Sequence, residues 1–203
     1  WREMGRQYGA LVKDDMKAFY TEITADLEKR GMSIEDQLTV ARGFSGDLSD
    51  DLIELLDGMA ETSGLTGDEV RLLNVGMLNL SGVLLGEENN DACSGIGAWG
   101  SYTPGGKLVF GRNWDMQRDG MLEYMKYLAV VIFHPAEGIA YANVHPLGNI
   151  YMETGINEHG LFLELNNGMY SDLNTYEDRE SSVSVLADVL TTCKTIDEAA
   201  AYL

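Results

Sequence analysis

The chain has 203 residues, of which 45% are hydrophobic and 23% charged, a composition typical of a globular protein that can bury a full core. Its formal net charge of −19 argues against nucleic acid as a partner, because phosphate binding needs clustered Lys and Arg and the sequence has no such cluster. No apolar run approaches the roughly 18 residues of a membrane-spanning helix, so we expect no membrane span.

Residues 1–90 carry a helical pattern. Apolar residues recur at three- and four-residue steps from Met4 to Leu27, which predicts one long amphipathic helix. Gly31 is the signal that ends this helix. Ser33 marks the start of a second helix, Gly64 the end of a third, and the Thr66–Glu69 capping-box pattern the start of a fourth. The polar segment 86–91 then predicts an exposed loop, the kind of accessible segment that proteolytic processing requires.

From Cys93 onward the pattern changes to strands. The expected hairpins pair 94–99 with 107–112 around a Thr-Pro-Gly-Gly turn, 127–133 with 139–144, and 151–156 with 161–165. Helices follow over 182–190 and after Thr195. This order, in which helices are followed by an antiparallel sheet and then by further helices, predicts an α+β fold.

Cys93 is the residue most suggestive of chemistry. Arg112 and Asp115 end the strand expected to pair with it, where a guanidinium would favour the thiolate and a carboxylate could orient an amine. A cut between Ala92 and Cys93 would also give the cysteine an α-amine, with a pKa of roughly 7.7–8.0, as its own base. The plainer alternatives are a buried structural thiol and a surface ion pair.

The run from Ala92-Cys93-Ser94 to Gly111-Arg112-Asn113-Trp114-Asp115 resembles the N-terminal-nucleophile (Ntn) hydrolases with a cysteine nucleophile. Within them it is most similar to the acyl-CoA:6-aminopenicillanic acid acyltransferase group, whose relatives include bile-salt (choloylglycine) hydrolases and acid ceramidase. Two further segments carry the same resemblance. One is residues 155–167, an Asn-Glu-x-Gly-Leu turn before a strand that ends in two asparagines, and the other is the opening segment, residues 3–9.

The resemblance implies a four-layer αββα sandwich. Residues 1–92 would be a helical pro-region or α-subunit, and residues 93–203 the N-terminal part of the catalytic domain. Family members continue into more strands, including one with a later oxyanion-side asparagine. We therefore expect this sequence to be a piece of a processed enzyme that lacks the second half of the sheet.

The resemblance also assigns roles to individual residues. Cys93 would be the nucleophile, Arg112 would lie beside the sulfur, and Asp115 would bind the terminal amine. Asn166 would donate to the oxyanion, with Asn167 as the alternative, although two asparagines at a strand end are also simply favourable in a turn. Trp114 would shape the wall of the substrate pocket together with Asn167.

These assignments predict a self-processing hydrolase or acyltransferase, cut between Ala92 and Cys93, that acts on linear amides through a thioester. Its partners would be a small amide or acyl substrate and its own cleaved subunits. The alternative is a non-catalytic relative whose acidic helical half docks a partner. We expect no cofactor, and no metal, because the three histidines have no ligand spacing with Cys or carboxylates.

Two further expectations concern the second cysteine and the compartment. Cys193 ends an expected helix and should be a small buried hydrophobe, since two cysteines make no disulfide framework. The chain begins at Trp1 and not at Met, so we expect an upstream segment to have been removed, which favours an extracytoplasmic location but leaves the compartment open.

Overall fold

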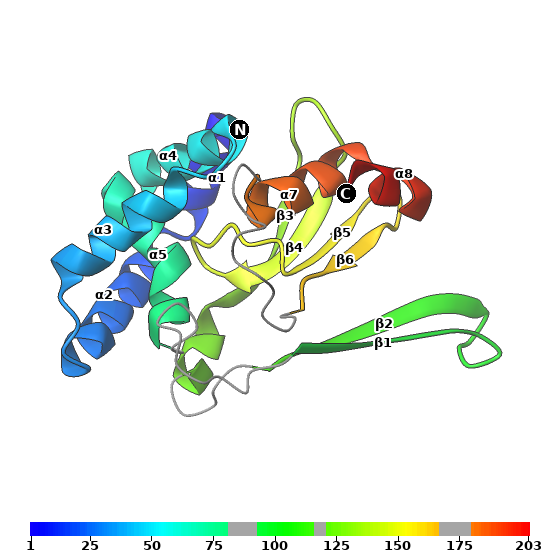
Figure 1. Cartoon of the computed structure of the whole chain (residues 1–203), viewed down its shortest axis with the longest axis horizontal. Helices are drawn as coiled ribbons and strands as arrows, with labels where there is room; N and C mark the ends of the chain where they lie inside the picture. Colours follow the sequence, from blue (N-terminus) through cyan, green and yellow to red (C-terminus); the bar gives the residue numbers. More distant parts are fainter. Residues whose placement is uncertain (81–92, 116–120, 167–179) are drawn as a thin grey trace, which may run out of the picture.

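The computed structural model describes residues 1–80, 93–115, 121–166 and 180–203. Within these ranges, the first part of the chain folds as five α-helices (Figure 1): α1 (Arg2–Leu11), α2 (Lys13–Lys29), α3 (Ile34–Ser45), α4 (Asp50–Ser63) and α5 (Gly67–Leu80). None of the described helices combines the length and apolar character needed to cross a membrane.

The single long helix expected over 4–27 is wrong. Val12 leaves the helical conformation, with φ −122° and ψ 22°, so α1 ends there and α2 begins at the next residue. The packing changes at this break, because α1 lies mainly against α4, whereas α2 lies mainly against α5 and has smaller contacts with α4 and α3.

Local signals delimit the other helices as expected. Ser33 caps α3 by accepting a hydrogen bond from the Asp36 amide, and Thr66 with Glu69 forms the reciprocal capping box before α5. Gly64 is left-handed, with φ +76°, where α4 ends, a conformation that glycine adopts without a steric penalty.

The strands form two antiparallel sheets within the described residues. We call β1 (Cys93–Gly100) and β2 (Gly106–Trp114) the hairpin. The main sheet has the order β3-β4-β5-β6, with β3 (Leu128–Phe133), β4 (Tyr141–Pro146), β5 (Thr154–Asn157) and β6 (Phe162–Glu164). A 3₁₀ helix, η2 (Leu122–Tyr127), precedes β3, and α7 (Ser182–Thr192) and α8 (Ile196–Tyr202) follow the sheet. The three expected hairpins and the mixed α+β class are therefore confirmed.

The main sheet has a different neighbour on each face. Figure 1 shows α7 and α8 along one side of it and the hairpin on the other. On the α7 side, Asn157 of β5 is buried and donates to the carbonyl oxygens of Leu190 and Cys193. Asn157 also accepts from two amides of the β5–β6 turn, so its side chain holds that turn. Cys193 ends α7 and is buried, as the sequence predicts.

The helices and the main sheet share one hydrophobic core. The ring of Phe19 in α2 lies 4.7 Å from that of Tyr127, centroid to centroid, and Tyr8 in α1 stacks on Phe133 of β3. The Tyr8 hydroxyl also accepts from the Gly148 amide. The expected boundary at residue 92 lies outside the described residues, but the segments on either side of it are joined by this core.

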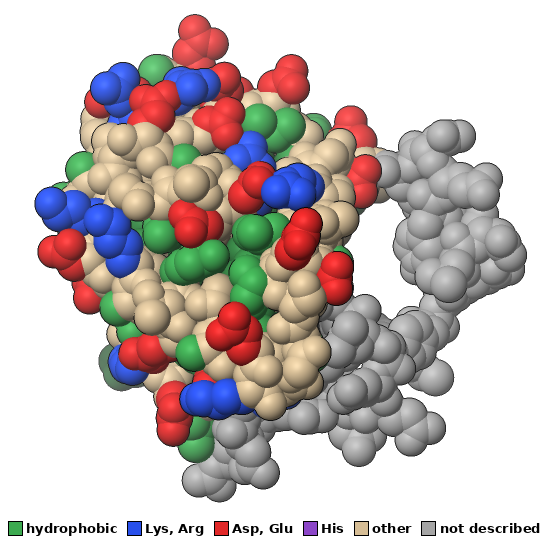
Figure 2. All heavy atoms as spheres, turned by 90° about the vertical axis from the view of Figure 1, so that its left-hand side faces the viewer, with side chains coloured by type: hydrophobic (Ala, Val, Ile, Leu, Met, Phe, Trp, Pro, Cys, Tyr) green, Lys and Arg blue, Asp and Glu red, His purple; other side chains and the backbone are tan. Residues whose placement is uncertain are grey.

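Acidic and basic side chains are interspersed over the helical end of the molecule (Figure 2). Ion pairs account for some of them, including Arg42 with Asp68 at 2.6 Å and Arg71 with Asp57 at 2.7 Å. The excess of acidic residues therefore does not make this face a uniformly negative surface.

Helices α1 and α4 pack at backbone distance, which only glycine allows. A Cβ placed on Gly5 would lie 2.1 Å from the Leu55 carbonyl oxygen, and one on Gly58 would lie 2.1 Å from the Arg2 carbonyl oxygen. Neither oxygen can move away without moving its own helix.

We therefore expect Gly5→Ala to destabilise the fold by about 1–3 kcal/mol or more, because it forces α1 away from α4. Gly43→Ala is the matched control: a Cβ there meets nothing within 4 Å, so the helix preference of alanine should stabilise the protein by about 0.5–1 kcal/mol. Urea unfolding of both variants measures the difference. Equal stabilities would show that α1 and α4 do not pack this closely.

Candidate active site

The register of the hairpin places Cys93 and Arg112 on one face. Cys93 pairs with Trp114, and Gly95 pairs with Arg112. Directly opposite residues share a face of a sheet, so all four face the same way. This is the face toward the main sheet, because Arg112 donates to Thr154 of β5. Cys93 and Arg112 are diagonal neighbours, a relation that spans about 7–8 Å in antiparallel pairs.

The guanidinium of Arg112 is buried between the hairpin and the main sheet. Its side chain is only 7% exposed, and its two Nη atoms donate to Thr154 Oγ1 at 2.8 Å and to the Leu165 carbonyl oxygen at 2.6 Å. Its Nε lies 4.0 Å from Glu164 Oε2. These contacts anchor the hairpin to β5 and β6, and they fix the positive charge one diagonal step from the thiol of Cys93.

Glu164 connects several parts of the site. Its carboxylate lies under the backbone of Gly95, where an added Cβ would come within 2.4 Å of both carboxylate oxygens. Oε1 accepts from Asn166 Nδ2 at 2.8 Å, and Oε2 faces Arg112 without a hydrogen bond to a described residue. The absence of a side chain at Gly95 is thus what admits this carboxylate.

Glu153 is the second carboxyl group near Arg112. Burial raises its pKa to about 7, and the nearby Arg112 charge opposes part of that rise. Sequence reasoning missed both Glu153 and Glu164. The only signal was a glutamate in each strand of the third expected hairpin, which is unusual in strands that are partly buried.

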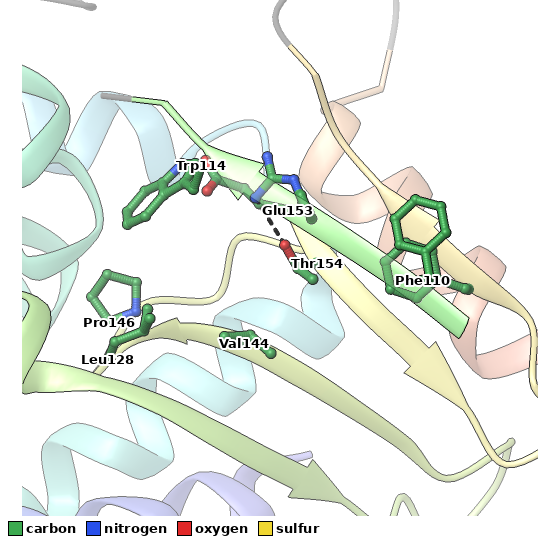
Figure 3. A pocket seen from close by; sticks show the side chains of 9 residues that line it. Phe110, Trp114, Leu128, Val144, Pro146, Glu153 and Thr154 are labelled. Atoms are coloured by element: carbon green, nitrogen blue, oxygen red, sulfur yellow. Dashed lines mark hydrogen bonds between the residues drawn. The ribbon is translucent and has the colours of Figure 1, made fainter. Parts of the chain in front are cut away.

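A cavity of about 280 Å³ lies between β2 and the main sheet (Figure 3). Its apolar walls are Phe110, Trp114, Leu128, Val144, Pro146 and Phe162. Its polar walls are Arg112, Glu153 and Thr154. Trp114, the partner of Cys93 in the hairpin register, lies at one end with Leu128 and Pro146, and Phe110 lies at the other.

The remaining predicted site residues lie around this arrangement. Asp115 is exposed directly after β2, beside the start of β1, and forms no hydrogen bond or ion pair with another described residue. Asn166 is exposed just after β6, where Glu164 holds one hydrogen of its amide. Ala92 and Asn167 lie outside the described residues. Cys93 itself is partly exposed.

The histidines are placed elsewhere. His145 is buried on the face of β4 that packs on the helices, where its ring contacts the Tyr8 hydroxyl and the Asn143 amide. Burial lowers its pKa to about 3, so it is neutral at physiological pH. His134 and His159 are exposed. Among the described residues, no three His, Cys, Asp or Glu side chains are placed to hold a metal ion.

No protein-family profile matches the chain, and no curated protein matches its sequence. Its function therefore has to be inferred from the chemistry of the site.

We expect Glu153→Gln to change how stability depends on pH. A carboxyl with a raised pKa binds a proton more tightly in the folded state, so the wild-type protein loses stability as pH rises from about 4.5 to 7. The glutamine variant should lack this loss, which is at most about 3 kcal/mol. Urea unfolding at pH 4 and pH 8.5 measures it, with Glu137→Gln, an exposed position, as the control for lost charge. The same pH slope in Glu153→Gln as in the wild type would contradict a buried carboxyl at this position.

Proposed function

We propose that the protein is a cysteine Ntn enzyme that hydrolyses linear amides or transfers their acyl groups. The observation that carries the proposal is the hairpin register, which puts the thiol of Cys93 at the start of β1, on the same face as a fixed guanidinium and next to a cavity wall. A partly exposed thiol on the same face as a positive charge, whose cross-strand partner Trp114 lines a cavity, fits the environment of a reactive cysteine.

The proposed reaction has two steps. The sulfur of Cys93 attacks the amide carbonyl carbon, the C–N bond breaks, and the thiol proton passes through the α-amine of Cys93 to the leaving amine. Water, or a second amine, then attacks the thioester, which releases the acyl group and restores the thiol. The amide of Asn166 has two hydrogens and uses one on Glu164, which leaves the other for the oxyanion.

Self-processing follows the same chemistry. The thiol of Cys93 attacks the carbonyl carbon of Ala92, and hydrolysis of the resulting thioester leaves a carboxylate on Ala92 and a free α-amine on Cys93. Asp115, beside the start of β1, would then bind that amine. The two products would remain together, because residues on either side of the cut share one core.

We also propose that the hairpin and the main sheet are two layers of the αββα sandwich. Their facing surfaces are largely apolar and line the cavity, and α7 and α8 cover the other side of the main sheet. The outer face of the hairpin is apolar but uncovered by described residues, with Ile96 74% and Val109 57% exposed. A further layer on this face would complete the sandwich.

Cys93→Ala should abolish both processing and turnover and leave the fold intact, because it removes only the nucleophile. Intact mass spectrometry after incubation at neutral pH should find two fragments of the wild-type chain, the second beginning at Cys93, and one uncut chain for the variant. Cys193→Ala, at the buried thiol, is the control and should be processed normally. Cleavage that persists without Cys93 would rule out this nucleophile.

The charges around Arg112 should shift the pH profile of Cys93 alkylation by iodoacetamide. Glu164→Gln removes a negative charge, so alkylation should begin at lower pH. Adding Arg112→Gln to Glu164→Gln removes the positive charge as well, so alkylation of the double variant should begin at higher pH than that of Glu164→Gln alone. Rates measured in a Cys193→Ala background test both shifts. Identical profiles would mean that Arg112 does not tune the thiol.

A further inference from the structure

The cavity lined by Trp114, the cross-strand partner of Cys93, has room for a small apolar group. The rings of Phe110 and Phe162 lie 4.1 Å apart, centroid to centroid, and close one end. Trp114 stands at the other end, opposite Cys93 in the hairpin register (Figure 3). The volume of about 280 Å³ equals that of roughly nine water molecules at ~30 Å³ each. That is room for one ring or a short branched chain.

The polar groups of the cavity disfavour an anionic ligand. Arg112 is the cation that could attract one, but both of its Nη atoms already donate to the protein and its charge faces Glu164. Glu153 is a carboxyl group in the cavity wall, and its ionised form would repel an anion. An uncharged ligand needs no free donor from Arg112 and is not repelled by the Glu153 carboxylate.

The ionisation of Glu153 should also control binding of a neutral ligand. An ionised carboxylate needs water, and an apolar group in the cavity would strip that water away. The charged or titratable groups around Glu153 are Arg112 on β2, Glu164 on β6 and Tyr151 before β5. Of these, Arg112 is the one that favours the ionised form, and it does not outweigh the effect of burial.

We propose that this cavity is the subsite for the acyl portion of the substrate, and that it accepts a short, uncharged, aromatic or branched acyl group. The assignment of the cavity to the acyl group rests on the proposed function, whereas the preference for a small neutral ligand rests on the cavity alone. The protein would therefore favour amides of small, uncharged aromatic or branched acids over those of dicarboxylic acids.

The experiment measures ligand binding by a chain that cannot react. Of the three tryptophans, Trp114 alone lines the cavity, so the Trp1→Phe, Trp99→Phe, Cys93→Ala variant reports on it by fluorescence. Benzamide is the neutral probe and benzoate the anionic one. Benzamide should bind more tightly than benzoate at pH 5.5, where the benzoate carboxylate would lose water and find both Nη atoms of Arg112 already engaged, and at pH 8.5, where ionised Glu153 would also repel it. The affinity of benzamide should weaken by up to roughly 30-fold at pH 8.5, which is the fall in the protonated fraction of a group with a pKa of about 7.

Variants of two cross-strand partners supply the specificity control. Val144 of β4 lines the cavity, whereas Val130 of β3, its partner across the sheet, is 68% exposed on the same face and does not line the cavity. Val144→Phe should abolish benzamide binding, and Val130→Phe should leave it unchanged. Glu153→Gln should retain binding and lose its pH dependence.

The outcomes separate this inference from the proposed function. No saturable benzamide binding, binding unaffected by Val144→Phe, or tighter binding of benzoate would overturn the cavity assignment even if the chain cleaves itself at Cys93. Benzamide binding with the expected pH dependence would support the neutral-ligand site. If Cys93 then proves unreactive and uncut, the ligand site stands and its role in acyl transfer falls.

Discussion

The burial of one positive charge, that of Arg112, determines how the second half of this protein is arranged. A guanidinium removed from water must be compensated by hydrogen bonds and an opposite charge, or its burial would cost several kcal/mol. Here the compensation comes from Thr154, the Leu165 carbonyl and Glu164, which lie on or beside β5 and β6. Arg112 belongs to β2, so satisfying it draws the hairpin onto the main sheet. The cavity, the position of Trp114 and the orientation of Cys93 all follow from that contact.

The helical segment contributes to the site indirectly. It supplies much of the core on which the main sheet rests, through Phe19 against Tyr127 and through Tyr8 against Phe133. Polar contacts reinforce the junction, as Asp26 accepts from the Tyr124 hydroxyl at 2.5 Å. The helical segment and the main sheet are therefore parts of one hydrophobic core.

The sequence could predict features whose cause is local. The hairpin at 103–106 follows from the residues of its turn, and the capping residues of α3 and α5 act on amides three positions away. The break at Val12 could not be predicted, because the apolar periodicity continues through it, and the change of main partner from α4 to α5 is a feature of the tertiary fold. Arg112 could be singled out from its neighbours in the sequence. Its partners could not, because they come from a later hairpin and nothing near Arg112 in the sequence identifies them.

The glutamate under Gly95 restricts how this sequence can vary. Any side chain at position 95 would collide with the carboxylate of Glu164, which is itself engaged with Asn166 and faces Arg112. The two positions are therefore epistatic. A larger residue at position 95 would require the Glu164 carboxylate to shift or residue 164 to shorten. A shift would disturb the contacts with Asn166 and Arg112, and shortening would remove the negative charge opposite Arg112, so a change at either position alters the surroundings of the other.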